Sequence, residues 1–178
     1  MSRQVTLKRL TLVNFKGLRN VAVEFGDGVT TISGRNGTGK TTIADSFAWL
    51  LWGKDSEGNS DSKFGIKTND AEGNFIPDLE HEVTGLFDVV DTETGEASSV
   101  ELRRVYVEEW KTPKGSTERT LSGHHTDYFF NGVPLKKAEY DAKVAAIIPE
   151  DLFKVITDPY YFLTLHWKAQ REYLLTMA

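Results

Sequence analysis

Residues 34–42, Gly-Arg-Asn-Gly-Thr-Gly-Lys-Thr-Thr, have the residue types and spacing of a phosphate-binding loop. They match G-x-x-x-x-G-K-[ST] at every fixed position. Glycine has no Cβ, so the backbone of such a loop can adopt positive φ and turn its N–H groups toward a phosphate. We expect Lys40 to reach the β- and γ-phosphates and the Thr41 hydroxyl to bind Mg²⁺. The predicted chemistry is binding of a nucleoside triphosphate together with Mg²⁺.

The segments on either side of the loop are the ones this motif needs. Residues 29–33, Val-Thr-Thr-Ile-Ser, are a β-branched run typical of a buried strand. After the loop, apolar residues recur at the spacing of one helix face: Ile43, Phe47, Leu50 and Leu51. A strand, the loop and a helix are therefore expected in that order, with the positive end of the helix toward the phosphates.

The composition indicates a globular domain of 178 residues, with 39% hydrophobic and 11% aromatic residues. There is no cysteine, which excludes a disulfide framework and a thiolate metal site. No run approaches the roughly 20 apolar residues of a membrane span, so we expect no membrane association and a cytoplasmic location. The net charge of -5 disfavours an autonomous polyanion binder, so any contact with DNA needs a local basic patch or a partner.

The chain divides into three parts by pattern. Residues 1–53 are expected to form the nucleotide-binding core, beginning with two strands within residues 5–25 and a bulge at Lys8-Arg9. The phosphate loop therefore follows an antiparallel hairpin, whereas in small kinases and GTPases it usually follows the first strand of a parallel sheet. The predicted fold class is mixed α+β, within the α/β group.

Residues 80–133 are expected to form an antiparallel β insert. Its predicted strands cover 83–90, 100–107 with a bulge at Arg103-Arg104, and 126–130 before an Asn-Gly turn. Residues 134–178 are expected to be helical, with Pro134 near a helix start and further helices over 150–157 and from 167 onward. The last helix has no terminating glycine, so we expect it to continue.

Hydrolysis by a P-loop enzyme also needs an acidic residue at the end of an apolar strand. Asp88 and Asp91 have that sequence context, but the alternation of their strand favours a solvent-facing Asp88 and no catalytic role. Residues 121–123, Leu-Ser-Gly, resemble the start of the signature of ABC-type ATPases. That signature opens a helix, whereas here a β-turn is the favoured interpretation.

Two further clusters favour structural roles. His124 and His125, with His81 or Asp127, suggest a metal site, but adjacent residues on a strand face opposite sides. The basic pairs Arg103-Arg104 and Lys136-Lys137 have no third cation beside them, and such pairs are typical of a solvated surface rather than of a DNA contact.

Several stretches together resemble the N-terminal half of SbcC-like ATPases, the DNA-repair branch of the SMC proteins, whose heads are of the ABC type. Residues 13–18, Val-Asn-Phe-Lys-Gly-Leu, precede a strand carrying Glu24 and then the motif at 32–42. The β-rich insert, the Ile148-Pro149 step and the closing helix around 170–175 fit the same pattern. The resemblance implies a P-loop NTPase head lobe of ABC type that ends at the start of a coiled-coil helix.

Besides the phosphate loop, the resemblance implies that Lys16 is a basic residue close to the nucleotide. It also implies that residues 64–67 lie near the base. The complete set of expected nucleotide contacts is Lys16, Gly34, Arg35, Asn36, Gly37, Thr38, Gly39, Lys40, Thr41 and Thr42. Such heads usually place a glutamine after the short helix that follows the Ile-Pro step, to sense Mg²⁺. This chain has Asp158 there, which could substitute as an oxygen ligand beside Thr41.

In this family the signature helix and the catalytic acid lie on a second lobe beyond the coiled coil. The resemblance thus implies a chain that binds ATP but needs its own C-terminal lobe to hydrolyse it. It also implies an ATP-dependent dimer with a second head, action on DNA and a nuclease subunit as a further partner. Two alternatives remain open: a non-catalytic nucleotide-binding docking module, and a small P-loop kinase or NTPase.

Overall fold

The computed structural model describes residues 3–60, 65–158 and 160–177. The chain forms two compact units, Met1–Asp141 and Ala142–Ala178. Within the described residues, none of the helices combines the length and the apolar character that crossing a membrane requires.

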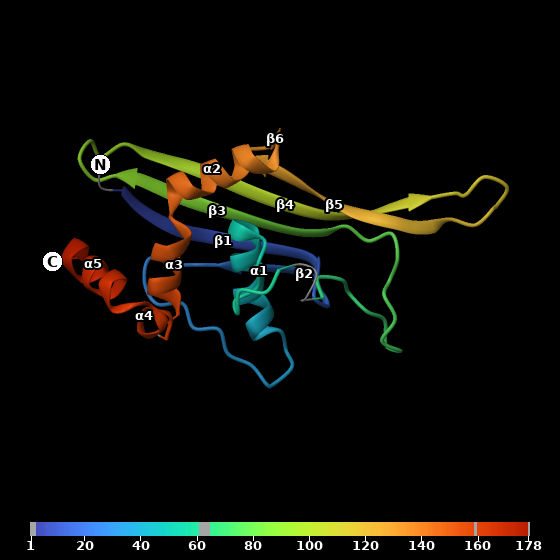
Figure 1. The fold of residues 1–178 in the computed structure, drawn as a ribbon, viewed down its shortest axis with the longest axis horizontal. Helices are drawn as coiled ribbons and strands as arrows, with labels where there is room; N and C mark the ends of the chain where they lie inside the picture. Colours follow the sequence, from blue (N-terminus) through green and yellow to red (C-terminus); the bar gives the residue numbers. More distant parts are fainter. Residues whose placement is uncertain (1–2, 61–64, 159, 178) are drawn as a thin grey trace. The chain divides into compact units, whose positions relative to one another are not determined.

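The first unit is built on one antiparallel sheet of six strands in the order β2-β1-β3-β4-β5-β6 (Figure 1). The strands are β1 (Arg3–Phe15), β2 (Leu18–Glu24), β3 (His81–Asp91), β4 (Ala97–Lys111), β5 (Thr120–Phe130) and β6 (Val133–Leu135). β3 pairs directly with β1. The antiparallel strands of residues 80–133 therefore extend the N-terminal hairpin into a continuous sheet.

Two of the turns between neighbouring strands begin with Asp or Asn. Asp91 begins the β3–β4 turn, where its carboxylate accepts the N–H groups of Glu93 at 2.9 Å and Thr94 at 3.0 Å. Asn131 and Gly132 have φ values of 50° and 76°, the left-handed pair that a two-residue hairpin between β5 and β6 requires. The predicted Asn-Gly turn is confirmed.

One of the two predicted bulges is confirmed and the other is wrong. The β1–β3 register shifts between Leu7 and Arg9, as expected. No shift occurs at Arg103-Arg104. The register between β4 and β5 shifts instead at Glu109 and Trp110, where Ser122 of β5 is the extra residue. The reason is that Arg104 is buried, with 2% of its surface exposed, so the regular alternation of β4 continues through it.

Helix α1 (Lys40–Trp52) covers one face of the sheet and makes the core with it (Figure 1). Trp49 packs on Phe15 with ring centroids 5.4 Å apart, and Phe47 stacks on Phe87 at 6.1 Å. Leu50 is fully buried, and burial of a leucine side chain contributes about 2 kcal/mol. The predicted helix after the phosphate loop is confirmed.

The predicted strand at residues 29–33 is wrong. This segment is irregular, and the side chains of Val29 and Ile32 are 98% and 39% exposed. A β-branched run forms a strand only when a neighbour supplies ladder hydrogen bonds. None of the strands in the described part of the chain pairs with it.

The remaining elements are helical. α2 (Lys137–Ile147) contains the boundary between the two units, and the second unit holds α3 (Glu150–Thr157), α4 (Tyr161–Thr164) and α5 (Trp167–Met177). The predicted helices over 150–157 and from 167 are confirmed. Pro134 lies in β6 and not at a helix start, because residues 133–135 pair with β5.

Candidate nucleotide-binding site

The phosphate loop leads directly into α1, with Gly39 as the residue before the first helical position. Gly37 and Gly39 have φ values of 80° and 91°, which favour glycine. A Cβ on Gly39 would also lie 2.9 Å from Cδ2 of Leu18. The positive φ and the nearby Leu18 side chain both favour glycine at this position.

The loop is closed by its own side chains. The ammonium of Lys40 donates to the carbonyl oxygens of Gly34 at 2.7 Å and Arg35 at 2.8 Å. The hydroxyl of Thr38 also donates to Arg35, at 2.8 Å. Lys40 thus lies folded over the loop, with its charge beside the start of the helix.

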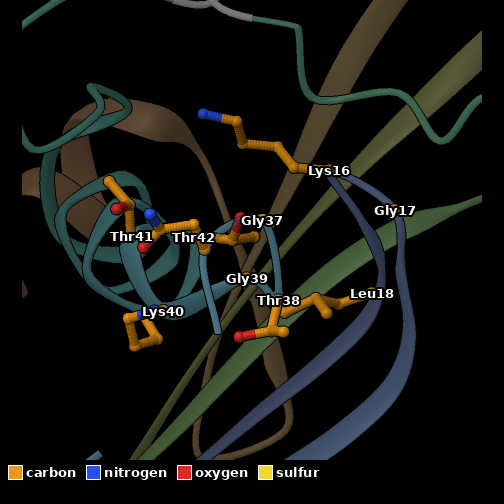
Figure 2. A pocket seen from close by; sticks show the side chains of 10 residues that line it. Lys16, Gly17, Leu18, Gly37, Thr38, Gly39, Lys40, Thr41 and Thr42 are labelled. Atoms are coloured by element: carbon orange, nitrogen blue, oxygen red, sulfur yellow. The ribbon is translucent and has the colours of Figure 1, made fainter. Parts of the chain in front are cut away.

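A cavity of about 470 Å³ opens beside the loop. Figure 2 shows the side chains around it, with Lys16 on one side and Thr38 and Lys40 on the other. Its lining consists of Lys16, Gly17, Leu18, Asn36, Gly37, Thr38, Gly39, Lys40, Thr41 and Thr42. None of these ten residues is acidic and two are cationic, so the cavity suits a chain of phosphates held by amides, ammonium groups and hydroxyls.

The structure brings Lys16 and residues 36–42 of the predicted set together around this cavity. Gly34 and Arg35 are not among the lining residues, and their carbonyls accept hydrogen bonds from Lys40. Gly17 and Leu18 do line it and were missed by sequence reasoning. Their position directly after Lys16 was the signal that could have found them. Contact between any of these residues and a nucleotide stays a prediction.

Lys16 lies in the turn between β1 and β2, and its backbone is constrained. Its φ is 46°, and its N–H donates to the carbonyl of Ile66 at 2.9 Å. The next N–H, of Gly17, donates to the hydroxyl of Thr68 at 3.2 Å. Residues 65–68 therefore hold the turn that carries the lysine at the cavity.

The ammonium of Lys16 forms an ion pair with Asp45 of α1, with Nζ 2.6 Å from Oδ2. Asp45 is buried, and its other oxygen accepts hydrogen bonds from Ser56. Burial raises the pKa of Asp45, but the hydrogen bonds from Lys16 and Ser56 together outweigh burial and lower it. Asp45 is thus an ionised carboxylate beside the site, and sequence reasoning missed it.

The segment expected near the base is only partly described, since Phe64 lies outside the described residues. Ile66 is buried, and Lys67 forms an ion pair with Glu108 of β4. Lys67 also lies over the ring of Phe75, 5.2 Å from its centroid. These contacts give Lys67 a structural role, and its proximity to a base stays a prediction.

Neither candidate catalytic acid lines the cavity. Phe87, the neighbour of Asp88 in β3, packs on α1, so alternation places Asp88 on the opposite face of the sheet. Asp91 belongs to the β3–β4 turn, where backbone hydrogen bonds from Thr94 and Glu93 lower its pKa. The absence of a catalytic role for Asp88 and Asp91 stays a prediction.

Residues 121–123 lie within β5 and form neither the helix start of a signature nor the favoured β-turn. Gly123 and Leu121 pair with the end of β4, which extends the hairpin as far as Thr120. The turn prediction is wrong because a bulge at Ser122 lets the pairing continue past Gly123.

No cluster of three metal-ligating side chains occurs among the described residues, and the histidines have other contacts. His81 is buried, with Nδ1 2.6 Å from the carbonyl oxygen of Asn14. His124 stacks on Tyr106, with ring centroids 4.9 Å apart. His125 lies beside Glu109, with Nδ1 3.1 Å from a carboxylate oxygen.

One of the two basic pairs departs from the expected solvated surface. Arg104 is buried over the rings of Trp49 and Tyr128, at 5.3 Å and 5.0 Å from their centroids. Arg103 faces the other side and bonds Glu82 at 3.2 Å. The expectation is wrong for Arg104, because alternation along β4 sends adjacent side chains to opposite faces. Lys137 is exposed and pairs with Asp141 at 2.6 Å.

Asp158, the predicted magnesium ligand, belongs to the second unit. It follows the last residue of α3, is exposed, and accepts the N–H of Tyr160 at 2.9 Å. Its role as a ligand stays a prediction.

Comparison with known sequences shows which family this chain belongs to. The AAA domain family matches residues 9–160. The DNA replication and repair protein RecF of Teredinibacter turnerae is 43% identical over 49 residues, which are 28% of this chain and 13% of that protein. The chromosome partition protein Smc of Bacillus subtilis is 44% identical over 46 residues, 25% of this chain and 4% of that protein. The alignments thus span a small share of these relatives.

Solved structures extend the likeness to the whole fold. One chain, from a study of ATP-driven dimerization and DNA-stimulated activation of SMC ATPases, superposes with a TM-score of 0.62 at 20% identity and covers 97% of this chain and 99% of that one. The Smc head domain of Pyrococcus furiosus superposes with a TM-score of 0.56 at 22% identity, over 81% of this chain and 33% of that one. The predicted mixed α+β head fold is confirmed. The chain belongs to the AAA domain family and has the fold of an SMC-type ATPase head.

Proposed function

We propose that this chain is the ATP-binding N-terminal lobe of an SMC-like ATPase that acts in DNA repair or DNA processing in the cytoplasm. The observation that carries the proposal is the cavity between residues 36–42 and Lys16, which combines backbone amides, two ammonium groups and the start of α1 without an acidic residue. The printed functions of the relatives, DNA replication and repair and chromosome partition, support the process.

Each part of the site has a distinct task in this proposal. The amides of residues 36–39 and the positive end of α1 bind the phosphates. Lys40 exchanges its bonds to the Gly34 and Arg35 carbonyls for bonds to phosphate oxygens. Thr41 is exposed in the first turn of α1, where its hydroxyl would hold Mg²⁺. The metal would neutralise the charge that develops on the phosphates.

Hydrolysis needs a second lobe in this proposal. The exposed β-branched segment 29–33 lies immediately before the phosphate loop and has the composition of a strand that lacks its neighbours. We infer that strands of the protein's C-terminal lobe pair with it, and that this lobe supplies the catalytic acid. The proposal includes three further partners. One is a second head, which ATP joins to this one; the others are DNA and a nuclease subunit.

Binding of a fluorescent ATP analogue in the presence of Mg²⁺ tests the proposal. Lys40→Ala removes the ammonium beside the phosphates, and we expect it to weaken binding by at least tenfold. Lys137→Ala is the matched control, since Lys137 is an exposed lysine paired with Asp141 on α2, and it should leave the affinity unchanged. Equal affinity of Lys40→Ala and the wild type, with both variants folded, would refute nucleotide binding at this loop.

Turnover is a second readout. We expect the chain by itself to hydrolyse ATP negligibly, because neither Asp88 nor Asp91 lines the cavity. Rapid hydrolysis by the purified chain, lost in Lys40→Ala, would contradict the need for a second lobe while leaving the binding proposal intact.

A further inference from the structure

Asp45 connects three segments that surround the phosphate cavity. It lies in the second turn of α1, after the phosphate loop. Its Oδ2 is 2.6 Å from the ammonium of Lys16, in the β1–β2 turn. Its Oδ1 accepts both the N–H of Ser56, at 3.1 Å, and the hydroxyl of Ser56, at 2.5 Å.

The two oxygens of Asp45 bond different residues, Oδ1 to Ser56 and Oδ2 to Lys16. Only 4% of the residue is exposed, and a buried carboxylate is stable only when its charge and its hydrogen bonds are compensated. The backbone N–H of Ser56 orients the carboxylate through Oδ1, and the Ser56 hydroxyl adds a second, stabilising bond to the same oxygen. Oδ2 is then directed at Lys16, so the orientation of this oxygen does not depend on the lysine alone.

Lys16 is held at both ends. Its backbone has a φ of 46° and its N–H is bonded to Ile66, while its ammonium is bonded to Asp45. A lysine side chain loses rotamer entropy when it is fixed. A lysine that is fixed before the ligand arrives avoids this loss during binding. An ammonium has three donors, so it can bond Asp45 and a phosphate oxygen at the same time.

We propose that Asp45 is a positioning residue for nucleotide binding, which holds the ammonium of Lys16 at the phosphate cavity so that the lysine meets the phosphates already in place. The inference rests on the proposed function, because it assigns Asp45 a role only if ATP binds at this cavity. Asp45 is not among the lining residues, so it acts through Lys16 rather than on the nucleotide.

A double-mutant cycle on the affinity for the fluorescent ATP analogue tests the inference. Asp45→Asn keeps the shape of the side chain and removes its charge, and Lys16→Met keeps the aliphatic stem and removes the ammonium. We expect Asp45→Asn alone to weaken binding about five- to tenfold and Lys16→Met at least as much. In the Lys16→Met background, Asp45→Asn should change the affinity less than twofold, because the group that it positions is gone.

Ser56→Ala is the matched control for a purely structural role. It removes one hydrogen bond from the same carboxylate while the Ser56 N–H and the Lys16 pair remain. We expect it to lower the melting temperature and to change the affinity less than twofold. Asp45→Ser keeps an acceptor at the buried position and takes the place of Asp45→Asn in the cycle if that variant is unfolded at the assay temperature.

The outcomes separate the alternatives. Equal losses from Asp45→Asn with and without Lys16 would overturn the inference, since the effect would then be structural. Tighter binding by Asp45→Asn would also overturn it, because Asp45 would then compete with the phosphates for the lysine. Failure of the proposed function itself has a different signature, namely wild-type protein that binds no nucleotide or binds it independently of Lys40.

Discussion

The hydroxyl of Tyr140 donates a hydrogen bond of 2.8 Å to the carbonyl oxygen of Leu50, across a separation of 90 residues. Both residues are completely buried. Leu50 lies in the last turn of α1, whose carbonyls have no partner within the helix. Tyr140 therefore caps the helix that begins at the phosphate loop, and burial, the main influence on its hydroxyl, raises its pKa.

Tyr140→Phe should lower the free energy of unfolding by about 1–3 kcal/mol, since it leaves the Leu50 carbonyl buried without its donor. Urea unfolding followed by circular dichroism measures this difference. Tyr160→Phe is the control, because Tyr160 is 73% exposed and should change stability by less than about 0.5 kcal/mol. Equal midpoints for the two variants would show that the buried bond contributes nothing.

Gly39→Ala should weaken both the fold of the loop and its binding of the ATP analogue. The residue has a φ of 91°, and its new Cβ would lie 2.9 Å from Cδ2 of Leu18. Positive φ costs an alanine about 1 kcal/mol, and the contact adds to this cost. We expect at least tenfold weaker binding and a lower melting temperature.

Leu18→Ala separates the two causes in Gly39→Ala. Combined with Gly39→Ala, it removes the close contact and leaves the backbone strain, so binding should recover in part. Gly26→Ala is the control for a glycine with open space around its Cβ, and it should bind as the wild type does. Wild-type affinity in Gly39→Ala would contradict the proposed loop geometry.

His81 predicts a dependence of stability on pH. Burial is the main influence on the ring and lowers its pKa below the ordinary 6.5, against the opposing effect of the Asn14 carbonyl. The unfolded chain therefore binds a proton below pH 6.5 that the folded chain does not, and stability falls as the pH falls from 6.5 toward the folded pKa.

His81→Asn keeps an N–H donor for the Asn14 carbonyl and removes the titration. We expect the free energy of unfolding of this variant to fall less steeply than that of the wild type between pH 6.5 and 5. His166→Asn, at an exposed position, serves as the control and should retain the wild-type slope. Parallel curves for the wild type and His81→Asn would show that His81 is not the group responsible.

The local elements of this fold were accessible from the sequence. The phosphate loop at 34–42, the helix after it, the bulge at Lys8-Arg9 and the Asn-Gly turn each depend on residues close in the chain. The order of the strands was not accessible, because β1 pairs with β3 across the loop, α1 and the segment between. Pairing of distant strands leaves no signal within a short window of sequence.

Segment 29–33 and Asp45 show two different limits of prediction from the sequence. The β-branched composition of 29–33 is a tendency that forms a strand only beside a partner, and the described residues provide none. Asp45 lies among polar and apolar residues of α1 with no motif of its own. Its contacts with Lys16 and Ser56 come from segments 29 and 11 residues away, so only the folded chain identifies it.

A last prediction concerns Arg104. Arg103 and Arg104 are adjacent on β4, so their side chains lie on opposite faces of the sheet, and Arg104 is the buried one. The guanidinium of Arg104 lies over the rings of Trp49, Tyr128 and Tyr140, at 5.0–5.3 Å from their centroids. A desolvated cation over an aromatic face is worth about 2 kcal/mol, and a planar guanidinium stacks where an ammonium does not.

Arg104→Lys should therefore lower the free energy of unfolding by about 2 kcal/mol although the charge is kept. Arg103→Lys is the comparison at a partly exposed site, where the guanidinium lies beside Glu82 and 3.9 Å from the centroid of the Phe129 ring. Solvent weakens both contacts there, so we expect Arg103→Lys to cost less than about 1 kcal/mol. Urea midpoints of the two variants, measured side by side, give the comparison. A larger loss from Arg103→Lys than from Arg104→Lys would contradict the burial of Arg104, because the exposed partner would then carry the stability.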